Sequence, residues 1–289
     1  MIRGKRETTR ETTNARFTSM KLGICNETFQ DWPFEKAFAH AAELGYAGIE
    51  FAPFTIHKNA YEISAETREL VRRQIDDAGL ETIGLHWLLA FTEGYYLTSP
   101  DADVRRKTTE YFCELARLCR DLGGGVMVLG SPQQRNLLPG VSHDQGLQYA
   151  ADVLRGACEV FADCGVLLAV EPLSPNEGDF LLTADAGSQL VDLVDSPNCR
   201  LHLDVKAMSS EGTPIDEIIR AHADKLVHFH ANDANMRGPG MGDIDFVPIL
   251  KALQDVEYDG WVCVEVFDYD PGVEALARES IEYLQRLLQ

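Results

Sequence analysis

Hydrophobic and polar positions follow a repeated unit along the chain from Lys21 onward. Segments with apolar residues at helical spacing end near an acidic residue and a glycine, and a short apolar run comes next. The junctions read "ELGYAGIE" (43–50), "DAGLETIGLH" (77–86), "DLGGGVMVLG" (121–130) and "DCGVLLAVEP" (163–172). A glycine just past a helix adopts the left-handed conformation without steric cost, and the apolar run is typical of a buried strand. The pattern therefore predicts helices and strands in alternation.

Eight apolar runs qualify as strands. They cover residues 21–26, 48–52, 81–88, 125–130, 166–172, 200–206, 226–232 and 261–267. A helical segment follows each run, which indicates right-handed βαβ units and a parallel sheet. Eight such units over residues 20–289 predict an α/β fold, a single (β/α)8 TIM barrel, whose usual size is about 250 residues. A doubly wound open sheet is disfavoured, because the first run ends in "CNETF" without a glycine-rich phosphate turn.

Three helix starts carry their own signals. Ser142 and Gln145 have the spacing of a capping box. At Thr213–Pro214 and at Asp270–Pro271 a capping residue stands before a proline, and proline is favoured at the first helical position. We expect a helix to begin at each of these places.

The first 19 residues differ from the rest of the chain. They are polar, rich in Thr and Arg, and show no periodicity, and a second methionine, Met20, stands directly before the first predicted strand. They lack the apolar stretch of a secretory signal. We interpret residues 1–19 as a disordered tail or an over-extended gene start, and residues 20–289 as one barrel domain.

Charge and cysteine content narrow the class of protein. The formal net charge is −20, which weighs against nucleic acid and anionic membrane surfaces as partners. No apolar stretch reaches the roughly 18 residues of a membrane span. The cysteines are odd in number and form no C-x-x-C motif, which favours a reducing compartment such as the cytoplasm. They are Cys25, Cys113, Cys119, Cys158, Cys164, Cys199 and Cys263.

Ionisable residues stand at the ends of four successive apolar runs. Glu171 ends "VLLAVE", and Asp204, His230 and Glu265 occupy corresponding places in the last three runs. In a barrel the carboxyl ends of the strands meet at one rim, so we expect these side chains to lie together. This mixed oxygen and nitrogen donor set suits Mn²⁺, Mg²⁺, Co²⁺ or Zn²⁺ and leaves positions open for a substrate.

Two further histidines precede these residues by two positions. His202 stands before Asp204, and His228 stands before His230. Residues two apart face the same side of a strand. We expect both histidines one layer deeper in the barrel, as hydrogen-bonded core residues.

The donor set resembles the metal shell of the xylose-isomerase-like superfamily of sugar isomerases and epimerases, and especially ketose 3-epimerases and hydroxypyruvate isomerases. The resemblance covers almost the whole chain after Met20. The segment "EPLSPNEGDF" is similar to a family motif with a substrate-binding glutamate, which is Glu177 here. "HANDANMRGPGMGDIDF" resembles a motif whose arginine holds substrate oxygens, which is Arg237, and "GLHWLL" resembles the segment that supplies a pocket histidine, His86.

One departure from the family pattern bears on the substrate. The epimerases carry D-x-x-H on the sixth strand, whereas this chain has Ala207 at the histidine position. Lys206 falls two residues after Asp204, on the inward side of a strand. Its ammonium either extends to solvent or points inward, where it could hold a carboxylate or an oxyanion. Trp87 either walls the pocket or packs in the core.

These residues indicate a divalent-metal-dependent sugar isomerase or epimerase that acts on a ketose or related keto-sugar. Glu171 and Glu265 would both bind the metal and carry protons. One would remove the proton beside the carbonyl to give a metal-stabilised enediolate, and the other would return it. Because all these reactions begin with the same proton abstraction, a metal-dependent lyase or dehydratase acting on a keto-inositol or 3-keto-sugar is the alternative.

Two other classes of protein are less consistent with the sequence. A DNA-repair endonuclease on this fold needs more histidine and acidic ligands for a trinuclear zinc site, and the charge of −20 opposes DNA binding. A non-catalytic sugar-binding barrel does not need both glutamates. A homo-oligomer is compatible with the sequence.

Overall fold

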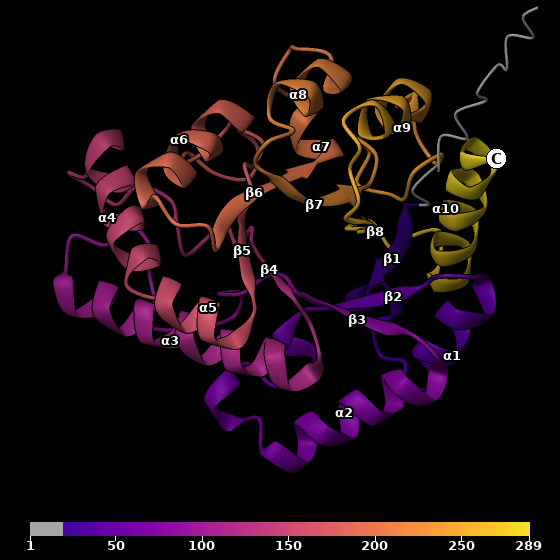
Figure 1. Ribbon diagram of the computed structural model, residues 1–289, viewed down its shortest axis with the longest axis horizontal. Coiled ribbons are helices and arrows are strands. Elements are labelled where there is room, and N and C mark those ends of the chain that lie inside the picture. Colours follow the sequence, from indigo (N-terminus) through magenta and orange to yellow (C-terminus); the bar gives the residue numbers. More distant parts are fainter. Residues whose placement is uncertain (1–19) are drawn as a thin grey trace, which may run out of the picture.

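Eight parallel strands close into a barrel in the computed structural model, which describes residues 20–289 (Figure 1). The prediction for residues 1–19 lies outside the described part. The strands are β1 (Lys21–Cys25), β2 (Gly48–Phe51), β3 (Glu81–Leu85), β4 (Val126–Leu129), β5 (Leu167–Val170), β6 (Cys199–Asp204), β7 (Leu226–Ala231) and β8 (Trp261–Val264). They follow one another in sequence order, and β1 pairs with β8. The predicted single (β/α)8 barrel is confirmed.

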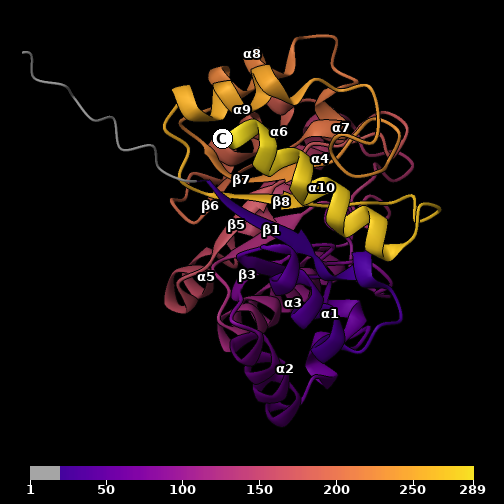
Figure 2. The same cartoon turned by 90° about the vertical axis from the view of Figure 1, so that its right-hand side faces the viewer.

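Helices surround the strands on all sides (Figure 1), and Figure 2 shows them on both sides of the barrel. The α-helices are α1 (Phe34–Leu44), α2 (Ala65–Ala78), α3 (Ala102–Leu122), α4 (His143–Arg155), α5 (Cys158–Cys164), α6 (Ala184–Val194), α7 (Val205–Met208), α8 (Ile215–Ala221), α9 (Phe246–Asp255) and α10 (Val273–Leu288). Three 3₁₀ turns, η1 (Asn26–Phe29), η2 (Pro53–Thr55) and η3 (Ala60–Glu62), lie in the loops after β1 and β2. In both figures the C-terminus lies close to the start of β1.

The local signals of helix ends are largely confirmed. The glycines that follow α1, α2, α3 and α5 all have positive φ. Ser142 and Gln145 form the predicted capping box of α4. The helices at the two proline signals begin slightly later than expected: α8 begins at Ile215, directly after Pro214, and α10 begins at Val273, after Gly272, which has a φ of 88°.

The strands are shorter than predicted at their carboxyl ends. β3, β5 and β8 end one residue before His86, Glu171 and Glu265, respectively. β6 ends at Asp204, and Lys206 lies in α7 rather than in a strand. The predicted ionisable residues therefore stand at the point where the chain leaves the barrel, on the rim where the loops begin.

The end of the barrel nearest these loops is polar inside. Glu50, His202, His228 and His230 are fully buried, although most of the protein's buried residues are apolar. The β6–β7 register places His202 beside His228 and Asp204 beside His230. Buried charged groups require partners, so this end of the barrel is where the functional site is to be sought.

Candidate active site

Three of the four predicted metal ligands gather at the end of the barrel. Glu171, Asp204 and His230 each offer a ligand atom to one group, which also includes His202, and these atoms lie within 4.8 Å of one another. All four residues are buried. They come from the neighbouring strands β5, β6 and β7, whose parallel register brings their ends to one level.

The fourth predicted ligand, Glu265, joins this group through His230. Its Oε2 lies 2.9 Å from Nδ1 of His230. Its Oε1 lies 3.1 Å from Nδ1 of His86 and accepts a hydrogen bond from Nε1 of Trp87 at 3.0 Å. The structure therefore brings His86 and Trp87 together beside the ligand group, and both contact the same glutamate.

Two more carboxylates, which the sequence analysis missed, extend this network. Glu27, in η1, places Oε2 2.9 Å from Nε2 of His86. Glu50, in β2, places Oε2 2.7 Å from Nε2 of His228 and 3.2 Å from Nε2 of His230. An acidic residue at the end of each of the first two strands, in "CNETF" and "GIEF", was the available signal. Carboxylates and imidazoles thus alternate through the site.

His202 does not behave as a hydrogen-bonded core residue. It is fully buried, as expected, but among residues 20–289 neither of its ring nitrogens has a hydrogen-bond partner. His228 does form the expected hydrogen bond, to Glu50. Burial and the neighbouring histidines hold the pKa of His202 well below its usual range, so its imidazole is neutral.

Lys206 points inward. Its Nζ donates to Oε1 of Glu177 and lies 4.4 Å from the ring centre of Phe267, and its side chain is 10% exposed. The inward direction of this side chain does not come from the alternation of residues along a strand, because Lys206 lies in α7. Oδ1 of Asp204 caps this short helix by accepting from N of Ala207 at 2.7 Å, and the helical turn directs the lysine toward Glu177.

Arg237 lies apart from the ligand group. Its Nε donates to Oδ2 of Asp268 at 2.8 Å, and its side chain is 36% exposed. The loop that carries it folds against the segment after β8, where the carbonyl of Met236 accepts from the backbone N of Phe267 at 2.8 Å. In this structure the arginine is held at the edge of the site by an ion pair.

Residues at the end of the neighbouring strand β4 fix the position of Glu171. A Cβ at Gly130, which directly follows β4, would lie 1.7 Å from Oε2 of Glu171. The fully buried Arg135 donates to the carbonyl oxygens of Leu129, at 3.1 Å, and Glu171, at 2.6 Å. Arg135 therefore ties together the ends of β4 and β5. Nothing in the sequence around "SPQQR" marks it for this role.

The charges in the group are consistent with a bound cation. Burial and the charges of Glu265 and Asp204 raise the pKa of Glu171 well above its usual range. Burial likewise raises the pKa of Asp204, against the charge of Lys206. Crowded buried carboxylates next to an unpartnered imidazole are unfavourable unless a cation lies among them. These oxygen and nitrogen donors suit a divalent ion.

The donor group lies at the carboxyl ends of the parallel barrel strands. Enzymes with this fold have their active sites on that rim, so the fold and the position of the group define the protein as a barrel enzyme. The chain belongs to the xylose isomerase-like TIM barrel family, whose model matches residues 38–287.

Known relatives of this chain are epimerases. A probable ketose 3-epimerase of Synechocystis sp. is 25% identical over 281 residues, which cover 88% of this chain and 91% of that protein. The fructoselysine 3-epimerase of Escherichia coli O157:H7 is 25% identical over 277 residues, 93% of this chain and 98% of the relative. The expectation of an enzyme of the isomerase class is confirmed by these relatives.

The solved structure of a D-psicose 3-epimerase in the presence of D-fructose shares the fold. Its TM-score is 0.83 at 23% identity, and the match covers 93% of this chain and 99% of that chain. Within residues 20–289, none of the helices has the length and apolar character needed to cross a membrane.

Proposed function

We propose that the protein is a divalent-metal-dependent epimerase or isomerase of a ketose or a related keto-sugar. The observation that carries the proposal is the pair of buried glutamates, Glu171 after β5 and Glu265 after β8, which reach the same ligand group from two well-separated strands. The names of the relatives, which are epimerases of ketoses, support the substrate class.

Glu171, Asp204, His230 and Glu265 are the residues that would hold the cation. A divalent ion there supplies Lewis-acid chemistry, which lowers the cost of negative charge on a carbonyl oxygen. Oδ2 of Asp204 accepts from Nδ2 of Asn232, and the nitrogens of His230 face Glu265 and Glu50.

Proton transfer falls to the two glutamates. One carboxylate removes the proton from the carbon beside the carbonyl, and the other returns a proton from the opposite face. Return to the same stereogenic carbon gives an epimer, and return to the former carbonyl carbon moves the carbonyl group, which gives an aldose when the proton came from the terminal carbon. His86 and Trp87 hold Glu265 in place through its Oε1. Lys206 and Glu177 form a partly buried ion pair that would bind substrate oxygens.

Hydrogen exchange with solvent tests the proposal. The Mn²⁺-loaded protein is incubated in D₂O with ketoses and 3-keto-glycosides, and deuterium at the carbon beside the carbonyl is followed by NMR. Glu171→Gln and Glu265→Gln keep the shape and one coordinating oxygen but remove the basicity. Each should lose turnover by about 10²–10⁴-fold while retaining much of its metal. In an epimerase, the variant that lacks only the proton-returning glutamate should still exchange, and reversing the assay direction should swap the two variants.

Glu211→Gln is the matched control, since Glu211 accepts from the backbone N of Ala184 through an oxygen that glutamine retains. A Glu171 or Glu265 variant with near wild-type turnover and bound metal would rule out the two-base mechanism.

A lyase remains the second candidate because of Lys206. Its buried ammonium stands near Asp204 where the family pattern has a histidine one residue further on, and a buried cation can assist a leaving oxygen. Loss of water from a keto-inositol or 3-keto-sugar, detected as a change in product mass in the same incubation, would favour the lyase.

We also propose a cytoplasmic location. In the described part of the chain all seven cysteines are free thiols, and unpaired thiols are typical of a reducing compartment.

A further inference from the structure

A cavity of about 730 Å³ opens beside the ligand group, at the carboxyl ends of β1, β2, β3 and β8. This volume falls in the range of about 300–1,000 Å³ that is typical of small-molecule sites. Glu171, Asp204 and His230 are not among its lining residues. The cavity therefore extends beyond these three residues of the ligand group.

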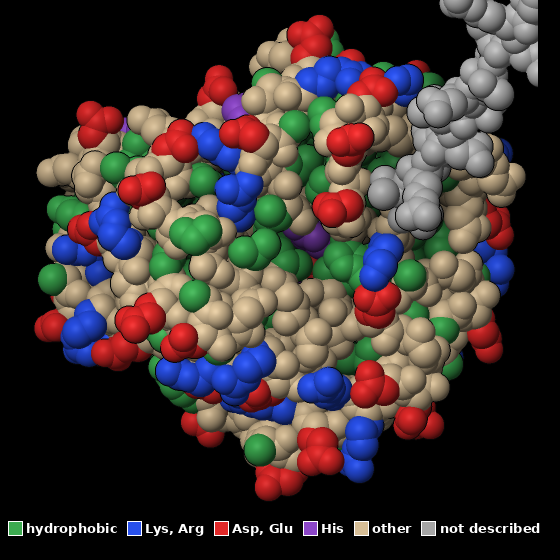
Figure 3. Space-filling view, in the orientation of Figure 1, with side chains coloured by type: hydrophobic (Ala, Val, Ile, Leu, Met, Phe, Trp, Pro, Cys, Tyr) green, Lys and Arg blue, Asp and Glu red, His purple; other side chains and the backbone are tan. Residues whose placement is uncertain are grey.

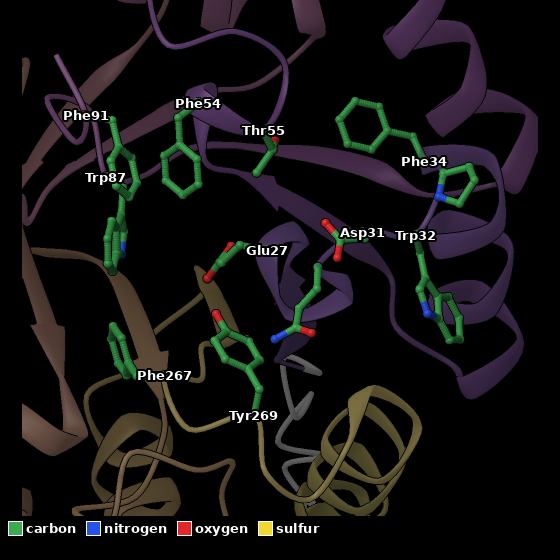
Figure 4. A pocket seen from close by; sticks show the side chains of 12 residues that line it. Glu27, Asp31, Trp32, Phe34, Phe54, Thr55, Trp87, Phe91, Phe267 and Tyr269 are labelled. Carbon is green, nitrogen blue, oxygen red and sulfur yellow. The ribbon is translucent and has the colours of Figure 1, made fainter.

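One side of the cavity is an aromatic wall made of Phe54, Trp87, Phe91 and Phe267 (Figure 4). The ring centres of Phe54 and Phe91 are 4.8 Å apart, those of Phe54 and Trp87 are 5.9 Å apart, and those of Trp87 and Phe267 are 6.2 Å apart. Phe91 is 58% exposed. When a ligand covers an exposed phenylalanine at the edge of a concave aromatic surface, the burial of the ring favours binding.

The aromatic wall is continuous with the reaction centre. Nε1 of Trp87 donates to Glu265, and Phe267 lies against the ammonium of Lys206. In Figure 4 the carboxylate of Glu27 points into the middle of the cavity, and this residue is linked to Glu265 through His86. A molecule whose carbonyl carbon lay between Glu171 and Glu265 could thus extend its other end along the wall.

Backbone strain is concentrated at this cavity. Seven non-glycine residues between positions 20 and 289 have positive φ, and three of them, Gln30 (48°), Trp87 (52°) and Phe91 (59°), line the cavity. Such conformations are costly for residues with a Cβ, and they gather at ligand-binding sites, where the surrounding structure maintains them. Two of the four rings of the wall are therefore held in place by strained backbone.

The charges of the cavity limit what can bind there. Its charged lining residues, as far as the described chain shows, are the carboxylates Glu27 and Asp31, without a lysine or an arginine. A phosphate or carboxylate substituent would meet like charge from these two carboxylates. An uncharged ring, by contrast, matches the aromatic wall in shape and polarity.

We propose that the cavity is a subsite for an uncharged, ring-bearing substituent of the substrate, so that the preferred substrate is a glycoside-type keto-sugar and not a free monosaccharide. This inference rests on the proposed function for the position of the sugar, whereas the recognition of the ring rests on the cavity alone. The aromatic wall is predicted to stack against the substituent while the carbonyl end reaches Glu171 and Glu265.

The test compares phenyl and methyl 3-ketoglucosides, which differ only in the ring. Calorimetry on the Mn²⁺-loaded protein should show the phenyl compound bound at least about tenfold more tightly, a difference of about 1.4 kcal/mol. Phe54→Ala and Phe91→Ala should each reduce this preference at least threefold. Tyr61→Ala is the matched control, because Tyr61 is 49% exposed and does not line the cavity.

Equal affinities for the two glucosides would overturn the subsite, as would a preference that survives in Phe91→Ala. Phe91 is exposed, so its variant stays informative even if Phe54→Ala is unstable. Hydrogen exchange is measured in the same samples. If phenyl preference depends on Phe54 and Phe91 but no keto-sugar exchanges, the subsite is supported and the proposed function fails. If keto-sugars exchange but the phenyl compound is not preferred, the proposed function is supported and the subsite is overturned.

Discussion

At the scale of single residues, His230 is the most constrained side chain in the site. Glu265 lies on its Nδ1 side and Glu50 on its Nε2 side. A histidine that binds a metal through one nitrogen is commonly oriented by a carboxylate on the other, and this outer contact tunes the affinity. Glu50 is fully buried, and in the described chain its Oε1 has no hydrogen-bond partner. Its negative charge is therefore directed at the histidines.

Glu50→Gln should lower the affinity for Mn²⁺ by about 10–100-fold, because the amide holds the His230 ring less firmly and adds no charge. Isothermal titration of the metal-free protein with Mn²⁺ measures this. Glu43→Gln, a change at an exposed position of α1, serves as the control. Equal affinities in the two variants would show that Glu50 has only a packing role.

Removing a proposed ligand should have a larger effect. In Asp204→Asn the site loses one negative charge, and an amide meets the side chain of Asn232, so metal binding should become too weak to measure at micromolar Mn²⁺. His230→Ala should behave in the same way. EDTA should abolish activity of the unaltered protein, and Mn²⁺ or Co²⁺ should restore it. Full activity in metal-free protein would contradict the metal requirement.

At the scale of elements, the strand ends decide where the site residues point. The chain leaves β5 at Val170 and β4 at Leu129, and Arg135 joins the two ends through backbone carbonyls. The space that Glu171 occupies exists because the residue after β4 is a glycine. The position of the Glu171 side chain after β5 thus depends on the absence of a side chain at Gly130 after β4.

Gly130→Ala should therefore displace Glu171 and lower turnover by at least about 10²-fold, the loss expected for a misplaced acid–base group. Thermal unfolding should still show a folded protein, because the change lies beyond the end of the strand. Gly125→Ala, just before the same strand, is a matched control, since a Cβ there meets no atom within 4 Å. Wild-type turnover in Gly130→Ala would mean that Glu171 is not needed in its observed position.

At the scale of the whole molecule, barrel closure joins two unlike halves. The ligand group comes from β5 to β8, whereas the aromatic wall comes from the loops after β2, β3 and β8. The pairings of β4 with β5 and of β1 with β8 hold the two halves together. Lys and Arg side chains stand beside Asp and Glu side chains over the face shown in Figure 3.

Every strand of the barrel lies within residues 20–289, and β1 begins at Lys21. A chain that starts at Met20 should therefore unfold at the same temperature as the full chain and keep its activity. Differential scanning calorimetry and the exchange assay measure the two quantities. A melting temperature several degrees lower would show that residues 1–19 contribute to the folded domain.

The sequence by itself determined the eight strand and helix units, because helical and strand periodicity and glycine helix ends are local properties. It also determined that Glu171, Asp204, His230 and Glu265 would share one rim, since parallel strands of a barrel end on the same side. The helices predicted to start at positions 214 and 271 start at Ile215 and Val273 instead, because the backbone after a capping residue follows tertiary contacts as well as local preference.

Only the tertiary structure decided which side chains meet. The contact of His228 with Glu50 joins residues 178 positions apart, and that of His86 with Glu27 joins residues 59 apart. The inward direction of Lys206 follows from a helical turn capped by Asp204, and the aromatic wall follows from three separate loops. Such contacts depend on how the closed barrel sets the distances between distant segments, and no periodicity in the sequence records those distances.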